Sequence, residues 1–388
     1  MASWRVWKWL RLSETRACIL IACLVFGESA SAQARVQLRP DTSGTWDIGV
    51  ARDAILSGDW LDVAGSLARM DSKRFLFVPS HGADGFVTVS HGDSGTEAQR
   101  IGRAGEGPGE YRYIRWVVPH ESGLHVFDPV ALRRTLLDAD YRVVHTSPLP
   151  VRLAGTAAVL GDSSYVVNGS ISTSARIGYA LHHFSPSGEL MRSFDDSPLG
   201  HGVPGAEISS YRSLRVGPDG LLWSAHRTRY QIDTWDVGQG ELLHSHMRAA
   251  DWFPPHLEWG SNDPRRSPRP EIIDMEIDPQ GRLWVLISVA SDHWSEAFVN
   301  LVEGSHPELD GHRLDDWTMA YDTRIEVIDP TEGCVIAHRI VDEYLPFFVG
   351  PGWAVSFPDY PTPDLQMQLW RLALSSQQPL EMGGSGCA

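Results

Sequence analysis

The feature that most constrains this chain is a recurrence of short apolar segments separated by tight turns. Each segment is rich in aliphatic or aromatic residues and is bounded by turn residues such as Gly, Pro and Asp, a pattern typical of β-strands. Apolar residues spaced by three and four positions, which would indicate helix, occur only briefly around residues 46–56. The sequence therefore predicts an all-β protein. Examples of the strand segments are residues 75–78, 86–89, 124–127, 165–167, 221–223, 283–287 and 324–328.

Several segments share one sequence motif, in which an apolar strand is followed by a glycine-containing turn and a second strand. The clearest copies are VGPDGLLW at 216–223 and IDPQGRLW at 277–284, and VPHESGLHV at 118–126 is a looser one. The glycine supplies the positive φ that a tight hairpin turn needs. In each case a second hairpin follows the motif at a similar spacing, so the two hairpins together form a four-stranded antiparallel meander.

A period of about 40–50 residues with four strands per repeat is typical of a β-propeller blade. We predict six blades, with five or seven as alternatives, in a single domain over residues 33–388. Residues 36–63 are expected to add a strand or a cap that closes the ring, because an open ring would leave unpaired strand edges. The predicted blades are residues 64–104, 113–147, 154–194, 211–248, 271–343 and 346–375, and loop insertions are expected near 196–209, 249–270 and 291–320.

The N-terminus has the organisation of a secretory signal peptide. Residues 1–16 carry four basic side chains against one acidic one, and the apolar run 17–27 leads to the small residues Ala30, Ser31 and Ala32. We expect cleavage after Ala32, with Ala34 as the alternative. The apolar run is too short to cross a bilayer as a helix. A secreted or periplasmic protein is therefore predicted, and a lipid anchor on Cys23 is the less favoured alternative.

Removal of residues 1–32 leaves 29 Lys plus Arg against 47 Asp plus Glu, a formal charge of −18. Such a surface repels phosphate backbones and anionic headgroups, which argues against nucleic-acid binding and against steering to anionic membranes. Of the four cysteines, only Cys334 and Cys387 remain. An oxidising compartment would allow one disulfide bond between them, and two unpaired thiols are the alternative.

Residues 101–111 read IGRAGEGPGEY and stand apart from the repeats. A P-loop needs Lys and then Ser or Thr after its last glycine, but Glu110 and Tyr111 stand there. A dinucleotide fingerprint needs a strand before it and a helix after it, whereas strands are predicted on both sides. We therefore expect a tightly turned connector between the first two blades. The residues given this structural role are Gly105, Gly107, Pro108 and Gly109.

A family resemblance rests on this same segment. The run RIGRAGEGPGEY at 100–111, followed by the strand GLHVFD at 123–128 and a basic turn, resembles six-bladed β-propeller proteins related to the NHL-repeat and TolB-like propellers. The GEGPGE signature of that family is matched in full at residues 105–110. The resemblance covers roughly residues 60–375. The first two blades match closely, and the later blades match only in the spacing of their strands. It implies a propeller fold in an exported bacterial protein, and it implies no particular activity.

Propellers gather functional residues around the central channel, chiefly on the loops that lead into each innermost strand. Several arginines and tyrosines stand on these loops in the predicted blades. A planar guanidinium binds carboxylate, sulfate or phosphate groups through two-point contacts. We therefore expect a small anionic or carbohydrate ligand, or a protein partner, at this face, with ion pairing to nearby acids as the alternative role. The candidate ligand-binding residues are Arg112, Tyr113, Arg115, Tyr211, Arg212, Arg265 and Arg266.

A calcium-dependent lactonase or esterase is the alternative function. Six-bladed propellers of that kind hold the cation with acidic and amide side chains in the channel. The ligands come from different blades, so no local spacing identifies them. The candidate calcium ligands are Asn168, Glu207, Asp274 and Glu276. A zinc site in the His- and acid-rich stretch 292–312 is disfavoured, because that stretch lacks the HExxH spacing.

Other aromatic and histidine residues are assigned mainly to packing. Trp223 and Trp284 occupy equivalent positions in two repeats, so we expect them to pack between blades. Trp116 falls near a connector, where an aromatic face could stack on a ligand or be buried. His244 and His246 alternate on one predicted strand and are interpreted as ordinary strand residues. The sequence thus predicts a secreted, monomeric propeller that binds a ligand or a protein around its channel.

Overall fold

The structure is a computed structural model of the chain, which divides into two units, residues 1–32 and 33–388. It describes residues 34–41, 45–57, 64–69, 73–79, 85–92, 95–171, 178–196, 210–257, 264–300, 312–358 and 366–376. The predicted signal peptide, Glu207 and Cys387 lie outside these residues.

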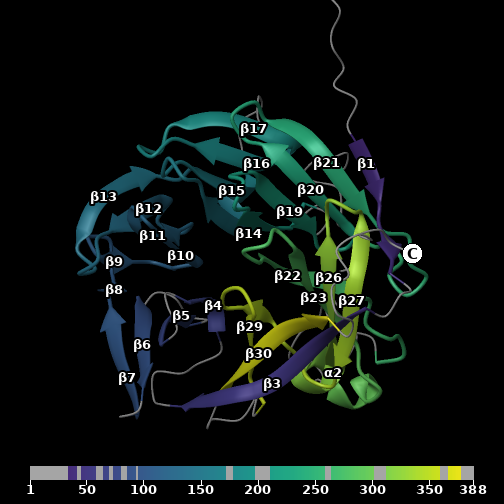
Figure 1. Cartoon of the computed structure of the whole chain (residues 1–388). Coiled ribbons are helices and arrows are strands. Elements are labelled where there is room, and N and C mark those ends of the chain that lie inside the picture. Colours follow the sequence, from purple (N-terminus) through teal and green to yellow (C-terminus); the bar gives the residue numbers. More distant parts are fainter. Residues whose placement is uncertain are drawn as a thin grey trace, which may run out of the picture. The chain divides into compact units, whose positions relative to one another are not determined.

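Six antiparallel sheets arranged in a ring confirm the predicted all-β, six-bladed propeller (Figure 1). The innermost strands of successive sheets contact one another around the whole ring, from the first blade to the sixth and back to the first. In the first five blades the strands are added outward in sequence order.

The strands of the first three blades are β4 (Ala64–Arg69), β5 (Arg74–Pro79), β6 (Phe86–Gly92) and β7 (Gly95–Ile101), then β10 (Trp116–His120), β11 (Gly123–Asp128), β12 (Arg133–Leu137) and β13 (Val143–Pro148), then β14 (Arg152–Val159), β15 (Tyr165–Ser170), β16 (Tyr179–Phe184) and β17 (Leu190–Asp196). The fourth blade has β18 (Arg212–Val216), β19 (Leu222–His226), β20 (Gln231–Asp236) and β21 (Glu241–Met247), and the fifth has β22 (Glu271–Ile277), β23 (Leu283–Ala290), β26 (Tyr321–Asp329) and β27 (Cys334–Val341).

The sixth blade joins the two ends of the domain. Its inner strands are β28 (Phe347–Phe348), β29 (Trp353–Ser356) and β30 (Gln366–Ser376), and its outermost strand is β3 (Trp46–Ser57) from the N-terminal region. The pairing of β3 with β30 is antiparallel over nearly their full lengths. The expectation of a closing strand within residues 36–63 is therefore confirmed, and the helical periodicity around 46–56 is wrong. Its buried residues, Ile48 and Leu56, are eight positions apart, a spacing that suits a strand as well as a helix.

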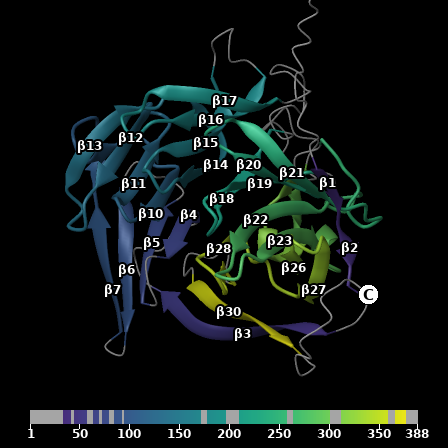
Figure 2. The same cartoon turned by 45° about the horizontal axis from the view of Figure 1, so that its top comes forward.

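Two further strands, which the sequence analysis does not predict, pair in parallel with the outer edges of two blades. β1 (Ala34–Gln37) pairs with β21 of the fourth blade, and β2 (Arg39–Pro40) pairs with β27 of the fifth (Figure 2). Leu38 stands between them, is buried, and joins the apolar cluster between these two blades. The N-terminal segment thus fastens the fourth blade to the fifth on their outer edge.

Shorter elements fill the connections. β8 (Arg103–Ala104) and β9 (Glu110–Tyr111) form a parallel pair that spans the glycine-rich connector. Between β23 and β26 stand η2 (Trp294–Ala297), β24 (Phe298–Asn300), β25 (His312–Leu314) and α2 (Trp317–Ala320), with Asp316 accepting hydrogen bonds at the N-terminus of α2. Within the described part of the chain, no helix is long and apolar enough to span a membrane.

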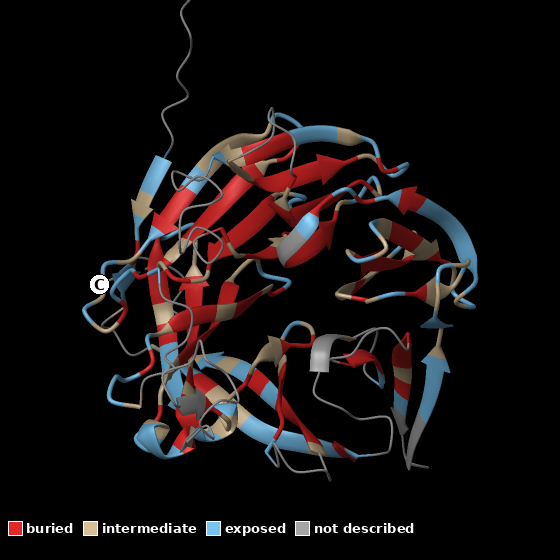
Figure 3. Ribbon diagram, turned by 180° about the vertical axis from the view of Figure 1, so that it is seen from behind, coloured by how far each residue is buried: buried red, intermediate tan, exposed pale blue. Residues whose placement is uncertain are grey.

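The core lies between blades. Trp223 and Trp284 are buried in two successive interblade clusters, which confirms the packing role predicted for both. The second strands of the blades, such as β19, are buried on both faces, whereas outer strands such as β13 are largely exposed (Figure 3). The fold therefore depends on side chains that fill the space between neighbouring sheets, and the innermost strands are left to surround the channel.

Candidate functional site

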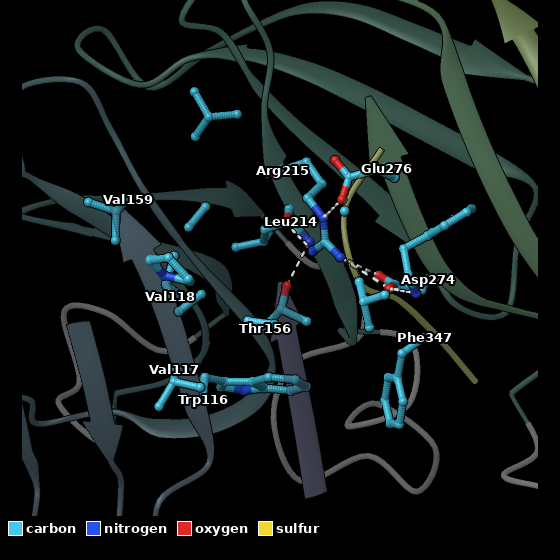
Figure 4. Close-up of a pocket in the computed structure, with 18 of the residues that line it drawn as sticks. Trp116, Val117, Val118, Thr156, Val159, Leu214, Arg215, Asp274, Glu276 and Phe347 are labelled. Carbon is cyan, nitrogen blue, oxygen red and sulfur yellow. Dashed lines mark hydrogen bonds and ion pairs between the residues drawn. The ribbon is translucent and has the colours of Figure 1, made fainter. Parts of the chain in front are cut away.

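A cavity of about 270 Å³ lies in the central channel, and innermost strands of all six blades line it (Figure 4). Most of its wall is apolar, from valines and alanines of β10 and β14 and from Phe347 of β28. The charged residues among its described lining are Arg215, Asp274 and Glu276. These three side chains come from the adjacent innermost strands β18 and β22, which brings them to one side of the cavity (Figure 4).

The guanidinium of Arg215 is engaged through all three of its nitrogens. Nη2 donates to both oxygens of Asp274, at 2.9 and 3.1 Å, and Nη1 donates to the carbonyl oxygen of Leu214 at 2.9 Å. Nε lies 3.5 Å from Oε2 of Glu276. Burial disfavours the guanidinium charge, but the two carboxylates outweigh it and raise the pKa of Arg215. Arg215 therefore stays cationic, and each of its nitrogens already has a protein partner.

Asp274 is also fully used by the fold. Its Oδ1 accepts hydrogen bonds from Ser213 Oγ and the Met275 backbone N–H, and its Oδ2 accepts one from the Phe348 backbone N–H, all at 2.9 Å. These partners belong to the fourth, fifth and sixth blades. Asp274 thus ties three innermost strands together.

Glu276 has spare hydrogen-bonding capacity. Its Oε1 accepts from the Ile277 backbone N–H at 2.9 Å, while Oε2 has only the long contact with Arg215. Its side chain is 16% exposed. Burial raises the pKa of the Glu276 carboxyl above its ordinary value, against the opposing effect of Arg215. Glu276 is therefore a carboxyl group in a mainly apolar cavity that can accept a hydrogen bond from a bound molecule.

Two aromatic residues complete the cavity wall. The indole N–H of Trp116 donates to the Gly155 carbonyl at 2.6 Å, and the Arg115 guanidinium lies 5.4 Å from the ring centre. Tyr211 lines the cavity, and the Arg227 guanidinium lies 5.0 Å from its ring centre. Both rings are thus held in place before any ligand arrives.

The glycine-rich connector is filled by its own carboxylate. Glu110 Oε2 accepts from the backbone N–H groups of Glu106 and Gly107, at 3.1 and 2.8 Å, and Oε1 accepts from Arg103. These hydrogen bonds, with that from Gly107 foremost, lower the pKa of Glu110. A Cβ at Gly105 would lie 2.3 Å from Glu110 Oε2, so the loop needs glycine there. Gly107, Pro108 and Gly109 complete this self-closed turn.

The predicted ligand-binding arginines lie on different strands and connectors of the described chain. Arg112 is paired with Glu106, and the backbone N–H groups of Arg112 and Tyr113 donate to Asp128. Arg115 Nη1 reaches the Tyr113 hydroxyl at 3.5 Å. Arg212 is the first residue of β18 and is buried in an ion pair with Asp195 at 2.9 Å, and Arg265 and Arg266 are exposed on the connector before β22.

The predicted calcium ligands are only partly brought together. Asp274 and Glu276 meet at the cavity, but Asn168 does not line it. The Asn168 amide donates to Ala180 and Ser210 carbonyls at 2.9 and 2.7 Å and accepts from the Arg212 backbone N–H at 2.9 Å. Its groups are therefore used to join the third and fourth blades. In the described ranges, no group of three or more His, Cys, Asp or Glu side chains could hold a metal.

The disulfide prediction concerns one described residue. Cys334 is buried at the start of β27 and is disulfide-bonded. Its predicted partner, Cys387, lies outside the described residues, so this pairing stays a prediction.

Sequence reasoning therefore reached Tyr211, Asp274 and Glu276 but missed Arg215, the group at the centre of the charged cluster. A signal for Arg215 exists in the sequence: RSLRV and EIIDMEI begin equivalent repeats, and each carries charge in a strand expected to be buried. Complementary charges on adjacent innermost strands would have indicated a pair.

Comparisons with known proteins extend only to structure. No family model matches the sequence, and no curated protein matches it. A DUF4221 family member from Bacteroides vulgatus aligns with a TM-score of 0.55 and 9% identity, over 85% of this chain and 99% of that chain. A provisionally named exported protein from Bacteroides fragilis aligns with a TM-score of 0.54 and 10% identity, over 89% of this chain and 99% of that chain. At such identities the likeness shows the fold alone, which is that of a six-bladed β-propeller.

Proposed function

We propose that this chain is an exported binding protein that takes a small ligand into its central channel. One observation carries the proposal: in a cavity reached by all six blades, Glu276 keeps a carboxylate oxygen whose one contact, with Arg215, is long, while each nitrogen of Arg215 and both oxygens of Asp274 already have protein partners. A mainly apolar cavity with a few placed polar groups is the usual form of a ligand site.

The cavity favours a ligand with a hydrogen-bond donor at one end and an apolar body. The donor, an ammonium or a hydroxyl group, would bind Glu276, and the apolar body would lie against the aromatic and aliphatic wall formed by Trp116, Phe347 and their neighbours. A volume of about 270 Å³ is slightly below the range of sites for drug-sized molecules, so a compound with a single ring fits best.

The paired arginines support a donor ligand over an anionic one. Arg112, Arg115 and Arg212 each have a partner already, so an anion would have to displace an existing contact. Export, a monomeric state and a relationship to NHL-repeat and TolB-like propellers are part of the same proposal. They rest on the N-terminal segment, the surface charge and the GEGPGE loop.

Benzylamine and benzyl alcohol are suitable first probes, since they share a ring and differ in the charge of the donor. We expect calorimetry to show saturable binding of benzylamine to the purified protein, and Glu276→Gln to weaken it about tenfold or more, because a hydrogen bond to a charged group is lost. Glu189→Gln, on the exposed turn between β16 and β17, is the matched control and should bind as wild type does. Absence of binding by both probes, or equal binding to the Glu276 variant, would contradict the proposal.

The calcium-dependent hydrolase remains an alternative prediction that the same preparation tests. Excess EDTA followed by restored calcium should leave the melting temperature unchanged if the channel binds its ligand through Glu276 and holds no cation. A reversible fall of several degrees on chelation would instead reveal a bound cation, because a metal held only by the folded state stabilises it by mass action.

A further inference from the structure

A second cavity, about 610 Å³ in volume, lies between the fourth and fifth blades. It shares no described lining residue with the channel cavity. One wall comes from β19, β20, β21 and β1, and the other comes from the turns that precede β23 and β27. We call this space the blade 4–5 cleft.

The strand register explains how polar side chains gather on one wall. Trp223 pairs with Thr234, and Thr234 pairs with His244, so the three stand side by side on adjacent strands. His246 stands two positions further along β21 and pairs with Val36 of β1. Because side chains two residues apart share a face of a sheet, all five face the fifth blade.

Two buried polar atoms in this cleft have no protein partner. Thr234 is 1% exposed, and its Oγ1 has no hydrogen-bond partner. His246 is 2% exposed; its Nε2 donates to the Pro330 carbonyl at 3.3 Å, and its Nδ1 has no partner. Burial lowers the pKa of His246, so the ring is neutral and Nδ1 is a free acceptor. A buried polar group without a hydrogen bond destabilises the folded state, which makes such atoms uncommon in folded proteins.

A third polar group differs from its counterpart in the next blade. The Trp284 indole N–H donates to Asp278 at 3.1 Å. The fourth blade has Gly217 at the position equivalent to Asp278, and a Cβ there would lie 3.0 Å from the Trp223 indole nitrogen. No described residue accepts a hydrogen bond from Trp223. The fourth blade thus omits the side chain that satisfies the same indole in the fifth.

The rest of the cleft is apolar or exposed. Pro218, Pro279 and Pro330 contribute apolar rings to the lining. Apart from the neutral His246, its described groups that can carry charge are Asp219 and His244, and both are exposed. The buried part of the cleft therefore offers hydrogen-bonding groups without a counterion for a charged ligand.

We propose that the blade 4–5 cleft binds a neutral ring compound that bears hydroxyl groups, through His246 Nδ1, Thr234 Oγ1 and the Trp223 indole N–H. A hydroxyl group donates to the imidazole nitrogen, and further oxygens of the ligand pair with the threonine and the indole. The ring lies against the prolines. The volume of the cleft is within the range of small-molecule sites. A sugar offers oxygens for all three contacts, and phenol tests the ring with a single hydroxyl group, so the experiment uses one of each.

The test titrates the purified protein with phenol and, separately, with methyl β-glucopyranoside, observed by saturation-transfer NMR. We expect one of the two to bind saturably below about 50 mM, and Thr234→Val to weaken it about tenfold, as the loss of one hydrogen bond predicts. Thr135→Val, the same substitution at a buried threonine of the second blade, should bind as wild type does. Because phenol also fits the channel cavity, the titrations are repeated in the Glu276→Gln background, where saturable binding that is still weakened by Thr234→Val belongs to the cleft.

A direct readout guards against variants that merely fail to fold. In protein labelled with ¹⁵N-histidine, the Nδ1 resonance of His246 should move on addition of the bound probe, since that nitrogen gains a hydrogen bond. Absence of saturable binding by both probes would overturn the proposal. Binding that moves no His246 resonance and is indifferent to Thr234→Val would place the probe elsewhere and would overturn it equally.

Discussion

At the scale of single residues, the most unusual group is a buried arginine that has no acid among its described partners. Arg134 is 1% exposed; its Nε donates to His125 Nδ1 at 3.1 Å and its Nη1 donates to the Pro186 carbonyl at 2.8 Å. Its guanidinium lies 4.9 Å from the ring centre of Tyr165. The second nitrogen of His125 lies 3.0 Å from Ser122 Oγ. The arginine therefore relies on a neutral imidazole as acceptor.

His125 should make the protein sensitive to acid. Burial, followed by the charge of Arg134, lowers its pKa to about 3, so below pH 6.5 the unfolded chain takes up a proton that the folded chain does not. The stabilisation is fully present above pH 6.5 and is lost as the pH falls toward 3, by about 2 kcal/mol at pH 5. Urea denaturation at pH 7 and pH 5 should show this loss in wild type and a smaller one in His125→Gln.

The same substitution at an exposed position controls for the loss of a histidine. His145→Gln, on the outer strand of the same blade, should keep the wild-type difference between pH 7 and pH 5. An equal loss of stability in wild type and His125→Gln would show that His125 does not govern this dependence.

Some candidate site residues can be predicted from the sequence and others cannot, for a physical reason. Asp274 and Glu276 could be predicted because acids are conspicuous on a strand expected to be buried. Thr234 and His246 look like ordinary strand residues, since what sets them apart is the absence of a partner across a cleft formed by another blade. Such an absence is a property of the assembled sheets and has no local pattern.

At the scale of elements, the glycine-rich connector is a rigid joint between the first two blades. Arg133 donates from two nitrogens to the carbonyls of Glu106 and Glu110, so the second blade also holds the loop from outside. Gly102 has a φ of 82°, and a Cβ there would lie 2.6 Å from the buried ring of Tyr111. Both backbone conformation and packing therefore require glycine at this position.

Two glycine substitutions separate these requirements. Gly220 has a φ of 79° but nothing within 4 Å of a Cβ, so Gly220→Ala adds backbone strain alone. We expect Gly220→Ala to cost about 1–2 kcal/mol and Gly102→Ala about 3 kcal/mol or more, because the latter also overpacks Tyr111. Denaturant unfolding measures both. Equal losses would mean that Tyr111 moves aside freely and that the connector is not a packed joint.

Strands could be predicted from the sequence where the pattern that identifies them lies within a few neighbouring residues. Hairpin turns with glycine fixed most strands and the blade count, because a turn type is encoded within a few residues. β1 and β2 could not be predicted in the same way, since a short parallel edge depends on a partner strand about two hundred residues or more away.

At the scale of the whole molecule, the ring is closed by β3, which comes from the opposite end of the domain to its partner β30. The Gln368 side chain donates to the Ala54 carbonyl at 3.0 Å, next to the register shift in this pair. Without β3 the sixth blade would end in β30, a strand of 11 residues, with its outer edge unpaired. Closure therefore both completes the blade and protects a long edge from association with other chains.

Two deletions test the closing strand against the outer strands that precede it. Removal of residues 33–45 takes away β1 and β2 with the buried Leu38, and we expect a folded protein of lower melting temperature. Removal of residues 33–57 also takes away β3, and we expect aggregation in size-exclusion chromatography because the β30 edge is exposed. A synthetic peptide of residues 46–57 added during refolding should restore the soluble species by strand addition, whereas a scrambled peptide should not. If the longer deletion remained soluble with the melting temperature of the shorter one, the ring would be held by the contacts between its innermost strands, and β3 would be an accessory edge.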